Sequence, residues 1–132
     1  MNATVTPYEA IGGEAGVRRL VQRFYALMDE LPEAYAIRKL HPEDLSGSEE
    51  KLFMYLSGYL GGPQLFVEKF GHPMLRARHL PFAIGKDEAE QWMMCMRMAM
   101  DECVSHEGLR VNLEKALNDL AHHMRNKDYG QP

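Results

Sequence analysis

Residues 71–82 read GHPMLRARHLPF, and this stretch decides how the rest of the chain can fold. Gly71 and Pro73 interrupt regular structure at its start and Pro81 near its end, so only a short helical piece fits between them. This piece carries two arginines and then one imidazole, that of His79. A lone histidine is more often a surface or hydrogen-bonded residue than a metal ligand. The interpretation of His79 therefore depends on the segments around it.

Amphipathic helices are predicted on both sides of this stretch. Their apolar residues recur at three- and four-residue steps, and no segment shows sustained period-two alternation, so the predicted fold class is all-α. Before the stretch we expect a short turn of helix after Thr6-Pro7, a long helix over Glu14–Leu31, and another that Ser46 or Ser48 caps and Gly61-Gly62-Pro63 ends. After the stretch we expect helices over Lys86–Ser105 and Glu107–Lys127, followed by a frayed tail.

Length and composition limit the classes of protein that fit. With 132 residues, of which 45% are hydrophobic, the chain is expected to form one domain over residues 1–132 with an ordered core of about 7–127. Its net charge of −4 offers no broad basic surface for nucleic acid. Without a basic leader or a run of roughly 20 apolar residues, it is expected to be cytoplasmic and to have no membrane segment. Cys95 and Cys103 are too far apart along one helix for a disulfide and are expected to stay reduced.

The residues around His79 fit the needs of a haem. A haem requires an axial imidazole, an apolar slot for the porphyrin and cations at its rim for the propionates. The chain offers these in His79, in Leu52, Leu56 and Trp92, and in Arg76 and Arg78. There is no CxxCH motif, so a haem would be held without thioether links, and no HExxH or phosphate-loop motif points to zinc or a nucleotide.

A series of short motifs runs through most of the chain. No single one is distinctive, but GGP, GHPxLRxRHxPF and a downstream tryptophan are hard to produce together by chance. The motifs are Gly12-Gly13, Arg23-Phe24-Tyr25, His41-Pro42-Glu43-Asp44, Glu49-Glu50-Lys51-Leu52, Gly61-Gly62-Pro63, Gly71-His72-Pro73-Met74-Leu75-Arg76, Arg78-His79-Leu80-Pro81-Phe82 and Trp92. From about Pro7 to Met124 this series resembles the group II truncated haemoglobins of bacterial type. The resemblance implies a two-over-two helical sandwich around a non-covalent haem b.

The resemblance also implies a role for each matching residue. His79 is then the proximal iron ligand. The distal residues are Tyr25, His41, Ser48, Leu52 and Trp92, of which Tyr25, His41 and Trp92 would donate hydrogen bonds to a ligand on the iron. The other cofactor contacts are Lys51, Leu56, His72, Leu75, Arg78 and Phe82, with Lys51, His72 and Arg78 near the propionates. Phe66 stands where related chains often have a tyrosine, so one hydroxyl directed at a propionate is missing.

The residue pattern alone leaves several of these roles open. Tyr25 and Trp92 lie on or beside apolar helical faces, where aromatic residues are usually core. His41 can equally be a surface residue of a turn. If His79 does bind iron, its other ring nitrogen is expected to donate to a backbone carbonyl one turn earlier, that of Leu75.

Three classes of function remain open from the sequence. The preferred one is a haem protein that binds dioxygen, carbon monoxide, nitric oxide or peroxide and has a redox or detoxifying role with an unidentified reductase. Two or three charge-assisted bonds of about 1.5–3 kcal/mol each would slow oxygen release too far for simple delivery. The second class is a ligand sensor or electron-transfer protein whose sixth ligand is Tyr25 or His41. The third is a haem-free helical interaction domain whose methionine-rich third helix binds a partner. The chain is expected to be a monomer or a homodimer.

Overall fold

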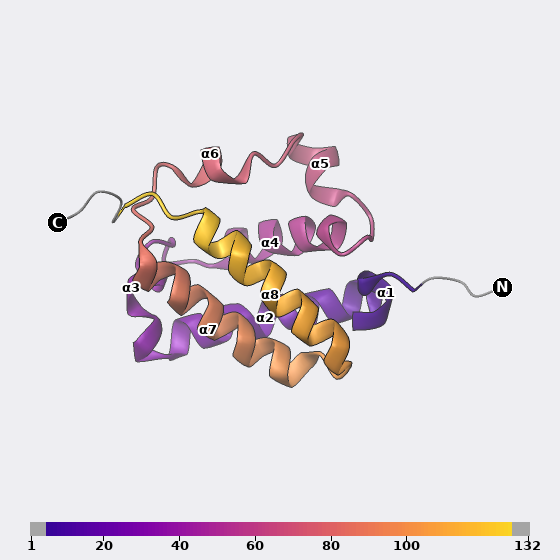
Figure 1. The fold of residues 1–132 in the computed structure, drawn as a ribbon. Coiled ribbons are helices and arrows are strands. Elements are labelled where there is room, and N and C mark those ends of the chain that lie inside the picture. Colours follow the sequence, from indigo (N-terminus) through magenta and orange to yellow (C-terminus); the bar gives the residue numbers. More distant parts are fainter. Residues whose placement is uncertain (1–4, 128–132) are drawn as a thin grey trace.

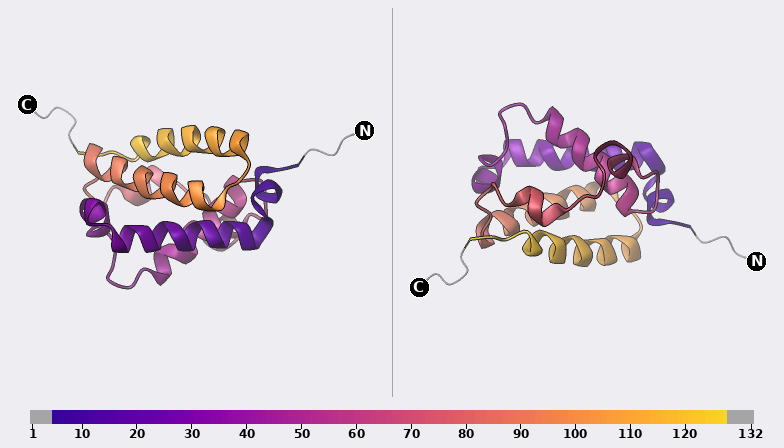
Figure 2. Two further views of the ribbon diagram at one scale, coloured as in Figure 1. Left: turned by 90° about the horizontal axis from the view of Figure 1, so that it is seen from below. Right: turned by 90° about the horizontal axis from the view of Figure 1, so that it is seen from above.

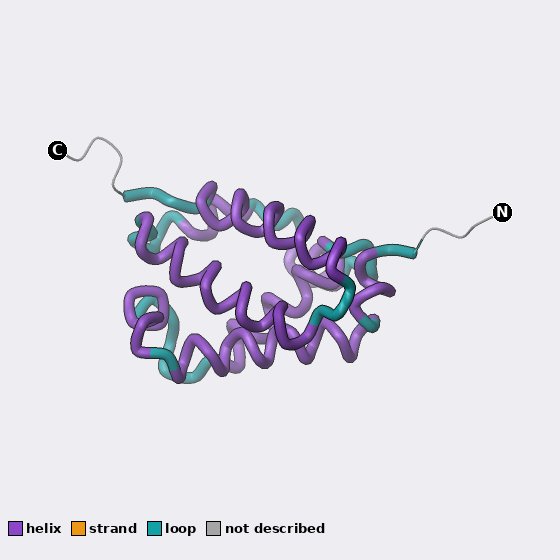
Figure 3. The backbone as a smooth tube through the Cα atoms, turned by 60° about the horizontal axis from the view of Figure 1, so that its bottom comes forward, coloured by secondary structure: helices purple, strands orange, loops and turns teal. Residues whose placement is uncertain are grey.

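The computed structural model describes residues 5–127, and in this part of the chain the secondary structure is entirely helical (Figure 1). The prediction of an all-α chain is therefore confirmed. Loops are confined to the connections and to the described residues before the first helix and after the last one (Figure 3). The helices are α1 (Pro7–Ile11), α2 (Gly13–Glu30), the 3-10 helix η1 (Pro32–Ala34), α3 (Tyr35–Arg38), α4 (Ser46–Tyr59), α5 (Leu65–Phe70), α6 (Leu75–His79), α7 (Lys86–Cys103) and α8 (Glu107–His123).

The four long helices form two packed pairs. Helix α2 packs against both α4 and α7, and α7 also packs against α8, so the α2–α4 pair faces the α7–α8 pair (Figure 2). Helices α5 and α6 run along the outer side of α4 and return the chain to the start of α7 (Figure 1). This is the predicted two-over-two arrangement, and it leaves the short helix with His79 opposite α4.

Local sequence signals explain most helix ends. Thr6 and Glu9 form a reciprocal capping box at the start of α1, and Gly12, in the left-handed region at φ 111°, ends it. The predicted serine caps of α4 are wrong, because α4 begins at Ser46 itself and the Asp44 carboxylate accepts from the Ser46 backbone N–H at 2.9 Å. An aspartate two residues before a helix can replace a serine cap in this way.

Two other sequence predictions also need correction. The last helix ends at His123 rather than at Lys127, because the backbone N–H of Asn126 turns away to donate to the carbonyl of Ile84 at 2.8 Å. The short helices η1 and α3 follow Pro32 where no helix was predicted. The expected frayed tail, residues 128–132, lies outside the described residues.

The core is made mainly by α2 and α7. Val17, Leu20 and Phe24 of α2 are fully buried, as are Met93 and Met96 of α7. Since most of the methionine-rich face packs inside the molecule, it is not available as a partner surface. Neither cysteine is in a disulfide, and burial raises the pKa of the Cys95 thiol to about 11. None of the described helices is long and apolar enough to cross a membrane.

A pair of glycines tests how tightly α1 and α2 pack. A Cβ at Gly16 would overlap the backbone carbonyl of Ile11, whereas a Cβ at Gly47 would meet no atom within 4 Å. Gly16→Ala should lower the free energy of unfolding by about 1–3 kcal/mol through overpacking. Gly47→Ala should raise it by up to about 1 kcal/mol, because alanine is the better helix former. Urea unfolding followed by circular dichroism measures both changes, and equal effects of the two substitutions would contradict the close contact.

Candidate functional site

A cavity of about 540 Å³ lies between α4, the α5–α6 segment, α7 and α8. This volume is typical of a site for a small molecule or cofactor. All predicted site residues except His72 line it, namely Tyr25, His41, Ser48, Lys51, Leu52, Leu56, Leu75, Arg78, His79, Phe82 and Trp92. They come from four separate helices and two loops, so the fold brings together residues that are up to 67 positions apart, from Tyr25 to Trp92.

His79 stands at the end of the one-turn helix α6 and faces the cavity. Its Nδ1 lies 2.6 Å from the carbonyl oxygen of Leu75, the partner expected from the sequence. A carbonyl can only accept, so Nδ1 must carry the hydrogen of the neutral ring. The lone pair of Nε2 is then available to a metal ion.

An aromatic cluster forms the opposite wall. The ring of Phe24 contacts those of Tyr25 and Trp92, with centroids 4.8 and 4.9 Å away. Tyr25 is only 6% exposed, and burial raises the pKa of its phenol, so the hydroxyl keeps its proton. Among the described residues, neither the Tyr25 hydroxyl nor the Trp92 indole N–H has a hydrogen-bond partner. Tyr25 is buried and Trp92 is half-buried, and both border the cavity, so a ligand there would meet two donors without protein partners.

His41 also lines the cavity, where it is half-buried. Its ring centroid is 5.8 Å from that of Tyr25, and its Nδ1 lies 2.9 Å from the carbonyl of Ile37. Burial lowers the pKa of His41 and outweighs the bond to Ile37, which raises it, while nearby Arg38 lowers it further, so the neutral ring is favoured at pH 7. Since Nδ1 carries the hydrogen, the neutral ring presents Nε2 as an acceptor. This differs from the donor that the sequence suggested.

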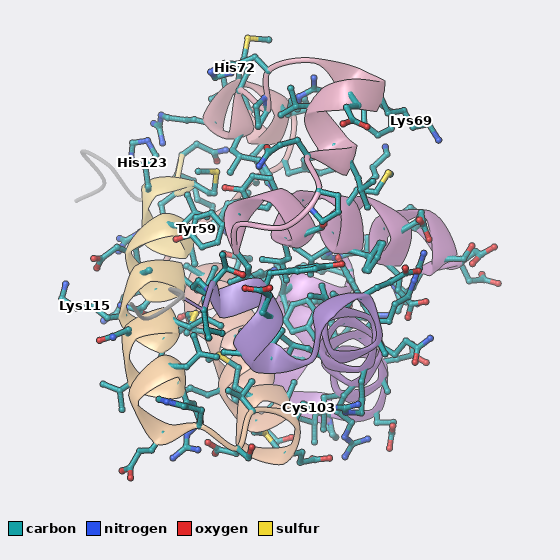
Figure 4. All side chains as sticks on the ribbon, turned by 90° about the vertical axis from the view of Figure 1, so that its right-hand side faces the viewer. Tyr59, Lys69, His72, Cys103, Lys115 and His123 are labelled. Atoms are coloured by element: carbon teal, nitrogen blue, oxygen red, sulfur yellow. The ribbon has the colours of Figure 1, made fainter. Side chains whose placement is uncertain are left out.

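Cations lie at the rim of the cavity. The Arg78 guanidinium stacks 5.3 Å from the Phe66 ring and donates to the backbone carbonyl of Pro73 at 2.6 Å. The Lys51 side chain is exposed and remains able to reach an anionic group. His72 is not part of the wall, because its ring turns back to accept from the Met74 backbone N–H at 3.2 Å. Figure 4 shows its side chain on the outer side of the segment, away from α4.

Sequence reasoning missed one charged residue of the wall, Glu88. It is only 4% exposed, although the pattern placed it in the first turn of a helix. One carboxylate oxygen accepts from the Gly85 backbone N–H at 2.8 Å, and the other lies 3.2 Å from the Lys127 ammonium. Burial alone would raise the pKa of Glu88, but these hydrogen bonds and the Lys127 charge outweigh it and the net shift is downward. The sequence pattern did not indicate that Glu88 is a buried residue of the wall, because its partner Lys127 lies far from it in the sequence.

The cavity fits a haem. A porphyrin supplies four nitrogens to its iron and asks the protein for one axial imidazole, which His79 can provide through Nε2. The apolar walls from Leu52, Leu56 and Phe82 suit a flat hydrocarbon ring, and Lys51 and Arg78 suit its propionates. The opposite wall holds the two unpaired donors and one acceptor. Such a helical chain has the architecture of a small haem-binding globin.

Comparisons with known proteins agree with this architecture. The family model described as bacterial-like globin matches residues 6–126, and the chain belongs to this family. It is 42% identical to the group 2 truncated hemoglobin YjbI of Bacillus subtilis over 121 residues, which cover 92% of this chain and 89% of that protein.

Solved structures give the same assignment. The group II 2-on-2 hemoglobin of Agrobacterium tumefaciens superposes with a TM-score of 0.93 at 55% identity, covering 95% of this chain and 97% of the other. A structure described as a truncated oxygen-avid haemoglobin from Bacillus subtilis gives a TM-score of 0.83 at 42% identity, covering 92% of this chain and 100% of the other. The protein is thus a group II truncated haemoglobin, its cofactor is haem b, and its class of ligand is diatomic gases. The haem-free alternative is wrong.

Proposed function

We propose that this haemoglobin holds dioxygen tightly and serves a redox or detoxifying role, with peroxide as a substrate, rather than delivering oxygen. The observation that carries the proposal is the polar distal wall. It combines two donors that lack partners among the described residues, the buried Tyr25 and the half-buried Trp92, with the acceptor nitrogen of His41. Bound haem would supply an open coordination position next to this wall.

The proximal side of the proposal rests on His79. Its Nε2 would be the axial ligand, and the bond from Nδ1 to Leu75 would hold the ring in the required tautomer. Leu52, Leu56 and Phe82 would contact the porphyrin, while Lys51 and Arg78 would face the propionates. Ser48 would line the distal space beside His41.

Tight dioxygen binding follows from the donors. Dioxygen gains partial negative charge when it binds ferrous haem, and preorganised donors stabilise such charge. Each charge-assisted bond contributes about 1.5–3 kcal/mol, so the Tyr25 hydroxyl and Trp92 indole together would slow release by orders of magnitude. The description of a Bacillus subtilis relative as oxygen-avid supports this step. Slow release does not suit oxygen delivery.

The role in peroxide chemistry follows from His41. A neutral His41 can take a proton from hydrogen peroxide at Nε2, and the proton can then return to a departing oxygen. The Tyr25 hydroxyl can stabilise the charge that develops there. Catalytic turnover would need an external reductase. The free thiols of Cys95 and Cys103 are consistent with the reducing cytoplasm as the place of action.

His41 also supports a second candidate function, that of a sensor or electron-transfer protein with an internal sixth ligand. Its Nε2 lone pair faces the same cavity as that of His79. The ferric spectrum separates the two candidates. A high-spin spectrum with water favours ligand chemistry, and a low-spin spectrum that His41→Phe converts to high spin favours the internal ligand.

Replacing His79 tests the proximal ligand. His79→Gly should lose most of its haem, because it removes the proposed axial bond, and added free imidazole should restore a five-coordinate spectrum. The ratio of haem to purified protein measures the loss. His72→Gly is the matched control, since that ring lies off the cavity wall, and it should keep its haem. Full retention of haem by His79→Gly would show that another residue is the ligand.

Trp92 separates a ligand donor from a core residue. Trp92→Phe keeps most of the apolar volume but loses the N–H, so dioxygen release should be roughly 10–150-fold faster, the equivalent of about 1.5–3 kcal/mol. Stopped-flow measurement of the release rates of dioxygen and carbon monoxide checks this. Carbon monoxide gains little charge when bound, and its release should change much less. Equal small effects on both gases would make Trp92 a core residue.

His41 should control the pH dependence of the reaction with peroxide. Its pKa is lowered from 6.5, so the neutral acceptor form persists through pH 7 and the rate for the ferric protein should fall only as the pH drops below 6.5. His41→Phe should slow the reaction on the order of 10²-fold and remove this pH dependence. Stopped-flow absorbance from pH 5 to 8 gives both results, with His72→Phe as control. An unchanged rate and profile in His41→Phe would refute the role.

A further inference from the structure

The helix that carries His79 cannot hold its own position. Helix α6 has five residues, none of them buried. A single isolated turn of helix is not stable in water, and most helices in proteins are held by packing of an apolar face. Other contacts must therefore fix the imidazole.

The residues that follow α8 supply such contacts. Beyond His123 the chain passes the loop between α6 and α7 (Figure 1). There the backbone N–H groups of Asn126 and Lys127 donate to the carbonyl of Ile84 at 2.8 and 3.2 Å. The side-chain oxygen of Asn126 accepts from the Ile84 N–H at 2.9 Å. The segment Met124–Lys127 is thus fastened to the chain just beyond the proximal histidine.

The same asparagine reaches His79 itself. Its side-chain nitrogen donates to the backbone carbonyl of His79 at 3.2 Å, and that carbonyl also accepts from the Phe82 N–H at 3.0 Å. The last carbonyls of a helix have no partner within it, so these bonds satisfy the end of α6. One amide group therefore joins the His79 carbonyl to the Ile84 N–H, and both of its polar ends are used.

A second set of hydrogen bonds holds the start of α6. The Arg76 guanidinium donates to the carbonyls of His123 and Arg125 at 2.6 and 2.9 Å. The helix is thus bonded to the C-terminal segment at both ends, through Arg76 near its start and through the carbonyl of His79 at its end.

We propose that Asn126 is a positioning residue for His79. Its bridge from Ile84 to the His79 carbonyl sets where the imidazole stands relative to the cavity, and so determines the strength of the iron–imidazole bond and the time for which haem is held. Arg76 supports the bridge from the other end of α6. The inference rests on His79 as the axial ligand, which belongs to the proposed function.

Two substitutions of Asn126 distinguish the effects of its two side-chain hydrogen bonds. Asn126→Ala removes both side-chain bonds, whereas Asn126→Asp keeps an acceptor for the Ile84 N–H and removes the donor to the His79 carbonyl. Asn112→Ala is the matched control, because Asn112 is an exposed asparagine of α8 whose side chain forms no hydrogen bond with the described residues. Gly16→Ala is the control for lost stability, because Gly16 packs against Ile11, outside the cavity wall.

The measurements use the haem-loaded protein. Resonance Raman of the five-coordinate ferrous form reports the iron–histidine stretching frequency, and transfer of haem to an acceptor protein reports its retention. Both Asn126 variants should shift this frequency and lose haem about threefold to tenfold faster, in line with the loss of one or two hydrogen bonds. Asn112→Ala should match the wild type, and Gly16→Ala should be less stable without a shift in the frequency.

Three results would overturn the proposal. The first is a loss of stability in both Asn126 variants with an unchanged stretching frequency, which is the behaviour of a merely structural residue. The second is an effect of Asn126→Ala that Asn126→Asp does not share, since the contact with His79 would then have no role. The third is wild-type behaviour of both variants. Haem retention by His79→Gly would instead refute the proximal ligand, and the two failures are thus distinguishable.

Discussion

The hydrogen bond from His79 Nδ1 to the carbonyl of Leu75 is the interaction on which the site depends. It fixes the tautomer, and only in that tautomer does Nε2 present a lone pair to the cavity. The bond lies within one turn of helix, since its partners are four residues apart. The harder requirement is to place this turn opposite α4. That requirement explains why a short helix with no buried residue is bonded on both sides to the distant C-terminal segment.

The tautomers of the two histidines also decide which groups of the distal wall donate hydrogen bonds and which accept them. The carbonyls of Ile37 and Leu75 each take the hydrogen of one imidazole, so His41 and His79 both present an acceptor nitrogen. Donation is left to Tyr25 and Trp92, whose phenol and indole groups cannot lose their protons at neutral pH. Dioxygen needs donors and peroxide needs a proton acceptor as well. The distal wall contains both, so the proposed slow oxygen release and the proposed peroxide chemistry would depend on one set of side chains.

The long helices could be predicted because periodicity and helix-breaking residues are local patterns. The candidate site came instead from the resemblance to a family, since the residue pattern alone left Tyr25 and Trp92 as ordinary core residues. The errors have two physical causes. His72 turns away because its ring satisfies the nearby Met74 N–H. Glu88 and Asn126 acquire their partners only when the C-terminal segment folds back onto the start of α7 and the loop before it. Contacts between residues so far apart do not follow from any regular spacing in the sequence, so the sequence alone does not predict them.

The residues that stabilise the helical core are different from those that position His79, the proposed haem ligand. The packed faces of α2 and α7 bury most of the large side chains, and they do not depend on α6 or on the residues beyond α8. The proximal segment is held by polar contacts, each of which contributes only about 0.5–1.5 kcal/mol. A substitution among these contacts can therefore change how the imidazole is held while the helical core persists. The position of His79 can then vary among chains with the same fold, because the residues that set it lie outside the core.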